Sequence, residues 1–161
     1  MKEQLFIIKN NMSAKIFSVS KKINSSPDVV YSIIADYINA HPKILPKPPF
    51  ISLKVERGGI GAGTEMLVQM KMFNKVQTFR TVVTEPVPGK TLVETTDTGY
   101  ITTFSVEPEN NGKSCLVTFS TELTNYPGLR KKFEFWVTSK LLQPVYKKEL
   151  EILASEAEKQ S

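Results

Sequence analysis

The change in hydrophobic period near residue 125 constrains the fold more than any other feature of the sequence. Between residues 64 and 123, apolar and polar side chains alternate with a period of two, which is typical of strands with one buried face. After the turn-forming segment 125–128 the period becomes about 3.6, which predicts a long C-terminal helix. The apolar positions of this helix are Leu129, Phe133, Trp136, Val137 and Leu141. Strands followed by one long helix predict an α+β fold, in which the helix packs on an antiparallel sheet.

Seven strands are expected in that sheet, because turn-forming residues divide the alternating segments. The expected strands cover residues 15–23, 50–57, 64–73, 76–85, 91–95, 100–107 and 114–123. The sequence Asn110-Asn111-Gly112 is a strong turn signal before the last of them. Pro144 lies inside the C-terminal helix and predicts a kink near Lys140, because proline removes a backbone hydrogen bond there.

A two-residue loop at residues 74–75 is expected to join the third and fourth strands. This register places Met70 opposite Phe79 on a largely apolar face. The other face is largely polar and carries Glu65 and Arg80, as a half-buried sheet requires. We therefore expect Glu65 and Arg80 to point away from the interior.

A helix is expected to begin after the first strand, at Ser26-Pro27-Asp28. Ser26 is a suitable N-cap and Pro27 suits the first helical position. One face of this helix is apolar through Val30, Ile33, Ile34, Tyr37 and Ile38. The helix should end at His41-Pro42, because the residue before a proline avoids the α conformation.

The composition suits one globular domain without a disulfide or a membrane span. The chain has 161 residues, 40% of them hydrophobic, and no apolar stretch approaches the roughly 20 residues of a membrane helix. The single cysteine, Cys115, excludes an internal disulfide and lies in an apolar run, so we expect it to be buried. We expect a loosely ordered leader at 1–13, one domain at 14–158, a monomer or weak dimer, and a cytoplasmic location.

The net charge of +5 does not indicate a nucleic-acid-binding protein. The lysines and arginines are scattered, and the densest cluster, residues 130–132, belongs to the expected C-terminal helix. Without a sustained basic stripe, we interpret this cluster as a solvated helix face. No nucleic-acid partner and no stable membrane insertion are therefore expected.

The stretch from residue 15 to 157 resembles the START-related helix-grip superfamily, and within it the polyketide cyclase/dehydrase and lipid-transport-like group. The resemblance is carried by segments 22–31 and 33–37, the His41-Pro42 break, the turn 58–63, the Glu85-Pro86 pair and the large closing helix. It implies a curved antiparallel sheet of about seven strands wrapped around the C-terminal helix, with two short helices after the first strand. It also implies a cavity between sheet and helix. Members bind lipids, sterols, hormones or polyketides, some catalyse cyclisation or dehydration, and others bind partner proteins.

The residue types do not point to a metal site or to a nucleophilic enzyme. A zinc site needs several ligands, but the chain has one histidine and one cysteine, which are far apart in sequence. No nucleophile-elbow motif accompanies His41, for which a capping or surface role and a place at a cavity mouth are both open. No cofactor is expected, and no catalytic residue is assigned.

Acid–base catalysis would need polar groups inside a dry cavity. The candidates are Glu65, Arg80, Glu94, Asp97 and Tyr100. The expected register turns Glu65 and Arg80 outward, whereas Tyr100 shares a face with Phe104. A buried tyrosine needs a partner for its hydroxyl, which could be a backbone carbonyl or a polar group of a ligand.

A stripe of methionines on the third strand is the most specific hint of a ligand site. Met66, Met70 and Met72 share one face, which is either ordinary core or the wall of a cavity, because flexible methionines adapt to varied apolar ligands. The candidate ligand-binding residues are Tyr37, His41, Met66, Val68, Met70, Phe79, Tyr100, Phe104, Phe119, Phe133, Trp136 and Leu141. A cavity of roughly 300–1,000 Å³ would be typical of such a site.

Three functions are compatible with these patterns. The first is binding or transport of a small hydrophobic ligand, such as a lipid, a sterol or a polyketide-like molecule, in a cavity between sheet and helix. The second is a cyclase/dehydratase-type enzyme, which requires an inward acid–base pair with a perturbed pKa. The third is a protein-interaction module with a filled interior and an exposed apolar patch.

Overall fold

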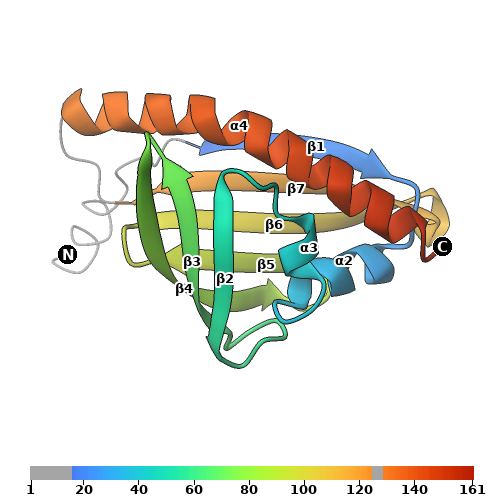
Figure 1. Ribbon diagram of the computed structural model, residues 1–161. Coiled ribbons are helices and arrows are strands. Elements are labelled where there is room, and N and C mark those ends of the chain that lie inside the picture. Colours follow the sequence, from blue (N-terminus) through green and yellow to red (C-terminus); the bar gives the residue numbers. More distant parts are fainter. Residues whose placement is uncertain (1–15, 125–128) are drawn as a thin grey trace, which may run out of the picture.

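The computed structural model describes residues 16–124 and 129–161. Seven antiparallel strands form one sheet in the order β1-β7-β6-β5-β4-β3-β2, as Figure 1 shows. The strands are β1 (Ile16–Ile23), β2 (Phe50–Arg57), β3 (Glu65–Met72), β4 (Lys75–Val87), β5 (Thr91–Thr96), β6 (Tyr100–Glu109) and β7 (Ser114–Leu123). The number of strands and their antiparallel pairing confirm the prediction. The expectation for residues 1–13 lies outside the described residues.

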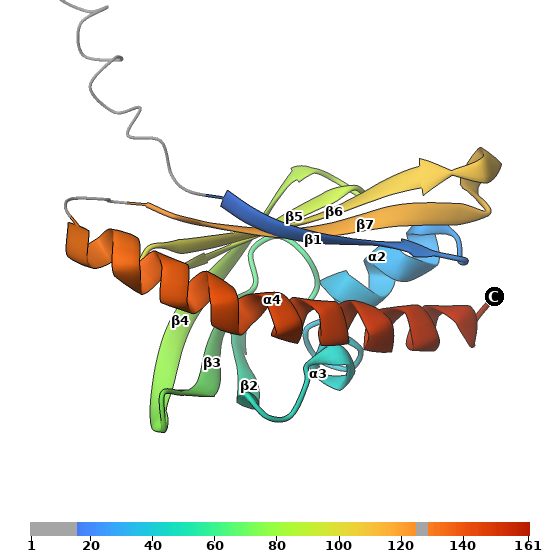
Figure 2. The same cartoon turned by 90° about the horizontal axis from the view of Figure 1, so that it is seen from above.

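Within residues 16–124 and 129–161, three α-helices and one 3₁₀ turn accompany the sheet. The α-helices are α2 (Pro27–Ala35), α3 (His41–Ile44) and α4 (Leu129–Glu158), and the 3₁₀ turn is η2 (Asn110–Gly112). Figures 1 and 2 show α4 running beside β1, while β2, β3 and β4 bend away from the plane of the other strands on the side of α4. The sheet therefore curves toward α4, as expected. No helix among residues 16–124 and 129–161 is long and apolar enough to cross a membrane.

Helix α2 begins as predicted but ends earlier. The Ser26 hydroxyl accepts a hydrogen bond from the Val29 backbone N–H at 3.3 Å, and Pro27 is the first helical residue. At the other end, the Asp36 carboxylate accepts hydrogen bonds from the backbone N–H groups of Ile38 and Asn39. This side-chain turn competes with the next helical turn, so the chain leaves the helix at Asp36. The prediction that Ile38 shares the apolar helix face is wrong, because its side chain is exposed.

The hairpin between β3 and β4 differs from the predicted register by two residues. Met72 pairs with Lys75, so residues 73–74 form the loop, and both have positive φ. Val68, not Met70, therefore lies opposite Phe79. Because side chains alternate with a period of two, this shift leaves every side chain on its predicted face.

Helix α4 has two halves with different surroundings. In its C-terminal half, Leu150, Leu153 and Ala157 are buried against the rest of the core. Pro144 lies inside the helix, and both views show the axis changing direction near the middle of α4, as this proline predicts. The side chains of residues 130–132, interpreted above as a solvated face, lie outside the description.

The prediction that Phe133, Trp136 and Leu141 face the sheet is wrong. Their exposed fractions are 67%, 54% and 42%. The stripe at Thr138, Leu142 and later positions turns inward instead, because one residue along a helix rotates a side chain by about 100°. Outside, Phe133 stacks on Trp136 with ring centres 6.2 Å apart, so the two aromatic residues shield each other on the surface.

Two local predictions outside the helices are confirmed. The residues Asn110, Asn111 and Gly112 all have positive φ in the turn before β7. Cys115 is fully buried, and burial, together with the nearby Glu109, raises the pKa of its thiol to about 11. The thiol is therefore protonated at neutral pH and packs as a small apolar group.

Candidate ligand-binding site

A cavity of about 240 Å³ lies between the inner face of the curved sheet and the inward side of α4. Its volume is slightly below the roughly 300–1,000 Å³ typical of sites for drug-sized ligands. It could hold about eight water molecules at roughly 30 Å³ each. The cavity therefore suits a small molecule with few non-hydrogen atoms.

The apolar wall of the cavity comes mainly from the strands. Its members include Met66, Val68, Met70, Phe79, Phe104 and, from α4, Leu142. The methionines lie on β3, whose alternation turns Met66, Met70 and Met72 toward the cavity while Gln69 and Lys71 lie on the other face. The methionine stripe is thus part of a cavity wall, which was one of the two open interpretations.

The structure brings seven of the twelve candidate ligand-binding residues together around this cavity. They are His41, Met66, Val68, Met70, Phe79, Tyr100 and Phe104. Tyr37 and Phe119 lie in the core beside it, where Phe119 packs edge-to-face on Phe104 with ring centres 4.7 Å apart. The remaining three, Phe133, Trp136 and Leu141, lie on the outer surface of α4.

Two glutamates form the polar end of the cavity. Glu94 comes from β5 and Glu149 from α4, and both line the cavity. The Tyr37 hydroxyl donates a hydrogen bond to Glu94 Oε1 at 2.9 Å. Burial raises the pKa of Glu94 to about 7, although this hydrogen bond opposes the shift. Burial and the charge of Glu94 raise the pKa of Glu149 well above its usual range.

His41 is buried next to this pair and lines the cavity, so it does not have the surface role that the sequence left open. Its Nδ1 lies 2.7 Å from the backbone oxygen of Ile34. A carbonyl oxygen can only accept, so Nδ1 carries the proton and Nε2 does not. Burial lowers the imidazole pKa to about 4, so the ring is neutral at neutral pH. The ring also stacks on Tyr37 with ring centres 4.6 Å apart.

Hydroxyl groups line the cavity between the sheet and α4. The Tyr146 hydroxyl lies 2.6 Å from Thr121 Oγ1 and 3.2 Å from Thr102 Oγ1. The Tyr100 hydroxyl lies 3.4 Å from Thr138 Oγ1 on α4. The partner of Tyr100 is therefore a side-chain hydroxyl, and neither of the partners expected from the sequence.

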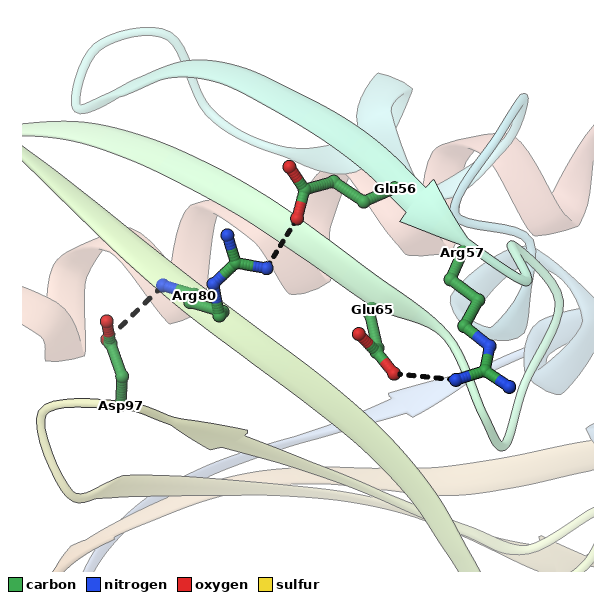
Figure 3. Close-up of polar contacts among 5 residues, drawn as sticks. All are labelled: Glu56, Arg57, Glu65, Arg80 and Asp97. Atoms are coloured by element: carbon green, nitrogen blue, oxygen red, sulfur yellow. Dashed lines mark hydrogen bonds and ion pairs between the residues drawn. The ribbon is translucent and has the colours of Figure 1, made fainter.

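Of the other acid–base candidates, Glu65 and Arg80 lie on the outer face of the sheet and Asp97 lies in the turn after β5, as Figure 3 shows. Arg80 pairs with Glu56, and the Asp97 carboxylate accepts a hydrogen bond from the Arg80 backbone N–H at 3.2 Å. Glu65 pairs with Arg57 at 3.4 Å. The outward orientation predicted for Glu65 and Arg80 is confirmed. No group of three or more His, Cys, Asp or Glu residues within the described ranges could hold a metal ion.

A family model described as polyketide cyclase/dehydrase and lipid transport matches residues 15–158. The chain belongs to this family. The match covers the curved sheet, the short helices and α4, and therefore every residue that lines the cavity. No curated protein matched the sequence.

Solved structures share the fold of this polyketide cyclase/dehydrase and lipid transport family member. The chain is 25% identical to KanY, whose solution structure superposes with a TM-score of 0.77 and covers 91% of this chain and 99% of KanY. A START superfamily protein from Mycobacterium smegmatis is 16% identical, with a TM-score of 0.69 and coverage of 91% and 99%. The Zhui aromatase/cyclase from a Streptomyces species is 9% identical, with a TM-score of 0.71 and coverage of 91% and 95%. These likenesses support the START-related helix-grip fold predicted from the sequence.

Sequence reasoning missed Glu149 and Tyr146 in this family member. On a helix with many charged residues, a glutamate resembles part of a solvated face, and only the tertiary fold shows that Glu149 is 2% exposed. One signal was available: Leu142, Tyr146, Glu149, Leu150 and Leu153 follow one another at helical spacing. A glutamate within that stripe indicates a buried polar group.

Proposed function

We propose that this protein binds a small hydrophobic molecule in the cavity between the sheet and α4, and holds or carries it there. The observation that carries the proposal is the cavity itself, which is walled by methionine and phenylalanine side chains and ends in polar groups. Each 100 Å² of apolar ligand surface removed from water would contribute about 2.5 kcal/mol. The family and the START-like fold support this function class, and lipids, sterols and polyketide-like molecules are the classes to screen, starting with members small enough for a cavity of about 240 Å³.

Leu141 and Leu142 provide a matched pair for the test. Leu142 lines the cavity, whereas its neighbour Leu141 points to solvent. We expect Leu142→Trp to fill part of the cavity and weaken binding of small apolar compounds in calorimetry by about tenfold or more. Leu141→Trp should leave binding unchanged. Equal affinities in the two variants would contradict the proposal, and so would the absence of binding by any small apolar compound.

A second candidate function is acid–base catalysis of the cyclase/dehydratase type. It is favoured by three groups that face the cavity: Glu94, Glu149 and His41. The pKa of Glu94 is near neutral pH. The imidazole of His41 is neutral, and its unprotonated nitrogen faces Glu149. Such groups can exchange protons with a bound carbonyl compound. If this function holds, Glu94→Gln should abolish turnover of a polyketide-like substrate while binding persists. Unchanged turnover would exclude it.

The remaining expectations concern where the protein works and in what form. We expect a monomer or weak dimer in the cytoplasm, where the buried Cys115 thiol stays reduced. The third function inferred from the sequence, a protein-interaction module with a filled interior, receives less support because the interior contains a cavity. Size-exclusion chromatography with light scattering would measure the oligomeric state.

A further inference from the structure

The cavity has the opposite charge character to the chain as a whole. The net charge of the protein is +5. Yet among the described residues that line the cavity there is no lysine and no arginine, whereas three are glutamates: Glu94, Glu134 and Glu149. Glu134 is exposed, Glu94 is half-buried and Glu149 is buried. Such a cavity attracts a cation and repels an anion.

The carboxyl group of Glu149 lines the cavity, and no donor among the described residues forms a hydrogen bond with it. Its side chain is 3% exposed, and its one ion-pair contact within the described residues is to His41 Nε2 at 4.0 Å, beyond hydrogen-bonding distance. Nε2 carries no proton, because Nδ1 donates to the Ile34 carbonyl oxygen. A buried polar group without a partner costs free energy, so this carboxyl can gain from a donor supplied by a ligand.

One carboxylate oxygen of Glu94 also lacks a hydrogen-bond donor among the described residues. Its Oε1 accepts the Tyr37 hydrogen bond, and within the described residues no donor reaches Oε2. Glu94 and Glu149 are close enough for the charge of one to affect the other. The polar end of the cavity therefore offers two coupled carboxyl groups that lack a cationic partner among the described residues.

The geometry points to a ligand with a protonated amine, whose ammonium group binds Glu94 and Glu149 while its apolar body lies against Met66, Met70 and Phe79. This inference rests on the proposed function and adds the ligand class. An ammonium group has three donors and a positive charge, which match the unpaired carboxyl oxygens in number and in sign. A hydroxyl ligand has one donor, and a carboxylate ligand would meet only like charges.

Isothermal titration calorimetry with three compounds of one shape tests the ligand class. The probes are naphthylmethylamine, naphthalenemethanol and naphthoate, used at pH 8 with the full chain. We expect the amine to bind about tenfold or more tightly than the alcohol, and the carboxylate not to bind. Glu149→Gln and Glu94→Gln should each weaken amine binding by about tenfold, and change alcohol binding by less than about twofold.

Glu151→Gln is the matched control. Glu151 lies on the same helix, exposed and paired with Lys148 at 3.3 Å, so this variant changes the charge without changing the cavity. Its amine affinity should equal that of the wild type, and thermal unfolding should show that all variants are folded. If the alcohol binds as tightly as the amine, or if Glu149→Gln leaves amine affinity unchanged, the amine inference is wrong while the proposed function stands. If none of the three compounds binds, the amine inference is wrong, and if no small apolar compound of any class binds, both are wrong.

Discussion

His41 Nε2 lies 4.0 Å from Glu149 Oε1, and both side chains are 3% exposed. The histidine belongs to α3 and the glutamate to α4, so the contact joins two segments that are far apart in sequence. Burial keeps the imidazole neutral at neutral pH and raises the pKa of the glutamate well above its usual range, so this contact is not an ordinary ion pair. The polar end of the cavity therefore contains carboxyl groups with raised pKa values and no cationic partner among the described residues, so its charge depends on pH.

Replacing both cavity glutamates should stabilise the protein at high pH. The pKa of Glu94 rises to about 7 on folding and that of Glu149 also rises, so the folded chain binds more protons than the unfolded chain above pH 4.5. The free energy of unfolding then falls as the pH rises through this range. The double variant Glu94→Gln/Glu149→Gln removes this loss, with a gain on the order of 2–3 kcal/mol at pH 8 and little gain at pH 4.

Urea unfolding of wild type and double variant between pH 4 and pH 8 measures this difference. Glu151→Gln, which changes an exposed carboxylate on α4, is the control and should show no such trend. A stability difference that is constant over the pH range would contradict the assignment of raised pKa values. The groups facing the two carboxyls are Tyr37, His41 and Tyr146, and only His41 titrates within this range.

His41 should stay neutral in the folded protein down to low pH. Burial lowers its pKa to about 4, despite the opposing effects of the Ile34 carbonyl and the Asp36 charge. Because the chain has one histidine, the imidazole signals in a proton NMR spectrum can be assigned without ambiguity. We expect a titration midpoint near pH 4. A midpoint near 6.5, the usual value, would show that the ring reaches solvent.

Two aromatic residues should differ strongly in their contribution to stability. Phe104 is 4% exposed and packs against Phe119, so Phe104→Ala should cost about 3–5 kcal/mol. Trp136 lies on the outside of α4, so Trp136→Ala should change the free energy of unfolding by less than about 0.5 kcal/mol. Urea denaturation compares the two. A large loss for Trp136→Ala would show that this part of α4 packs against the sheet, as the sequence pattern indicated.

The turn before β3 offers a test of a close backbone contact. The Glu85 carboxylate accepts hydrogen bonds from the Tyr31 hydroxyl and, at 3.1 Å, from the Ala62 backbone N–H. A Cβ atom on Gly61 would lie 2.7 Å from Glu85 Oε2, whereas a Cβ atom on Gly63 would meet nothing within 4 Å. Both glycines have positive φ, so an alanine at either position would introduce the same kind of backbone strain.

We expect Gly61→Ala to destabilise the protein by about 1–2 kcal/mol more than Gly63→Ala, because only the former disturbs the Glu85 hydrogen bonds. Thermal or urea unfolding measures both variants. In a Glu85→Ala background the difference between the two should disappear. If it persists there, the contact with Glu85 is not its cause.

The architecture could be predicted from the sequence because it depends on periodicity. The hairpin at residues 73–74 shows why. Its register differs from the predicted one by two residues, yet Met66 and Phe79 lie on the predicted face of the sheet. The face is preserved because side-chain orientation in a strand repeats every two residues. In helix α4, the same kind of error in position changes which side chains face inward. A shift of one position rotates a helical side chain by about 100°, so the prediction placed Leu141 inward where Leu142 is.

The polar end of the cavity could not be predicted because it is assembled from distant segments. Glu94 was a candidate from its strand, but nothing local indicates that Tyr37 donates to it or that Glu149 lies nearby. The early end of α2 likewise depends on one side chain, Asp36, whose hydrogen bonds replace the next helical turn. Such contacts follow from tertiary packing and not from the hydrophobic pattern.

The division of α4 at its proline separates two properties of the protein. Residues after Pro144, such as Leu150 and Leu153, hold the fold together and also supply the polar groups Tyr146 and Glu149, whereas Thr138 and Leu142 before it form another part of the cavity wall. Proline leaves the carbonyl of Lys140 without its helical donor, so the two halves are coupled weakly at this point. Substitutions at Leu142 in the first half can therefore reshape the apolar wall of the cavity, at little expense to the thermal tolerance set by the second half.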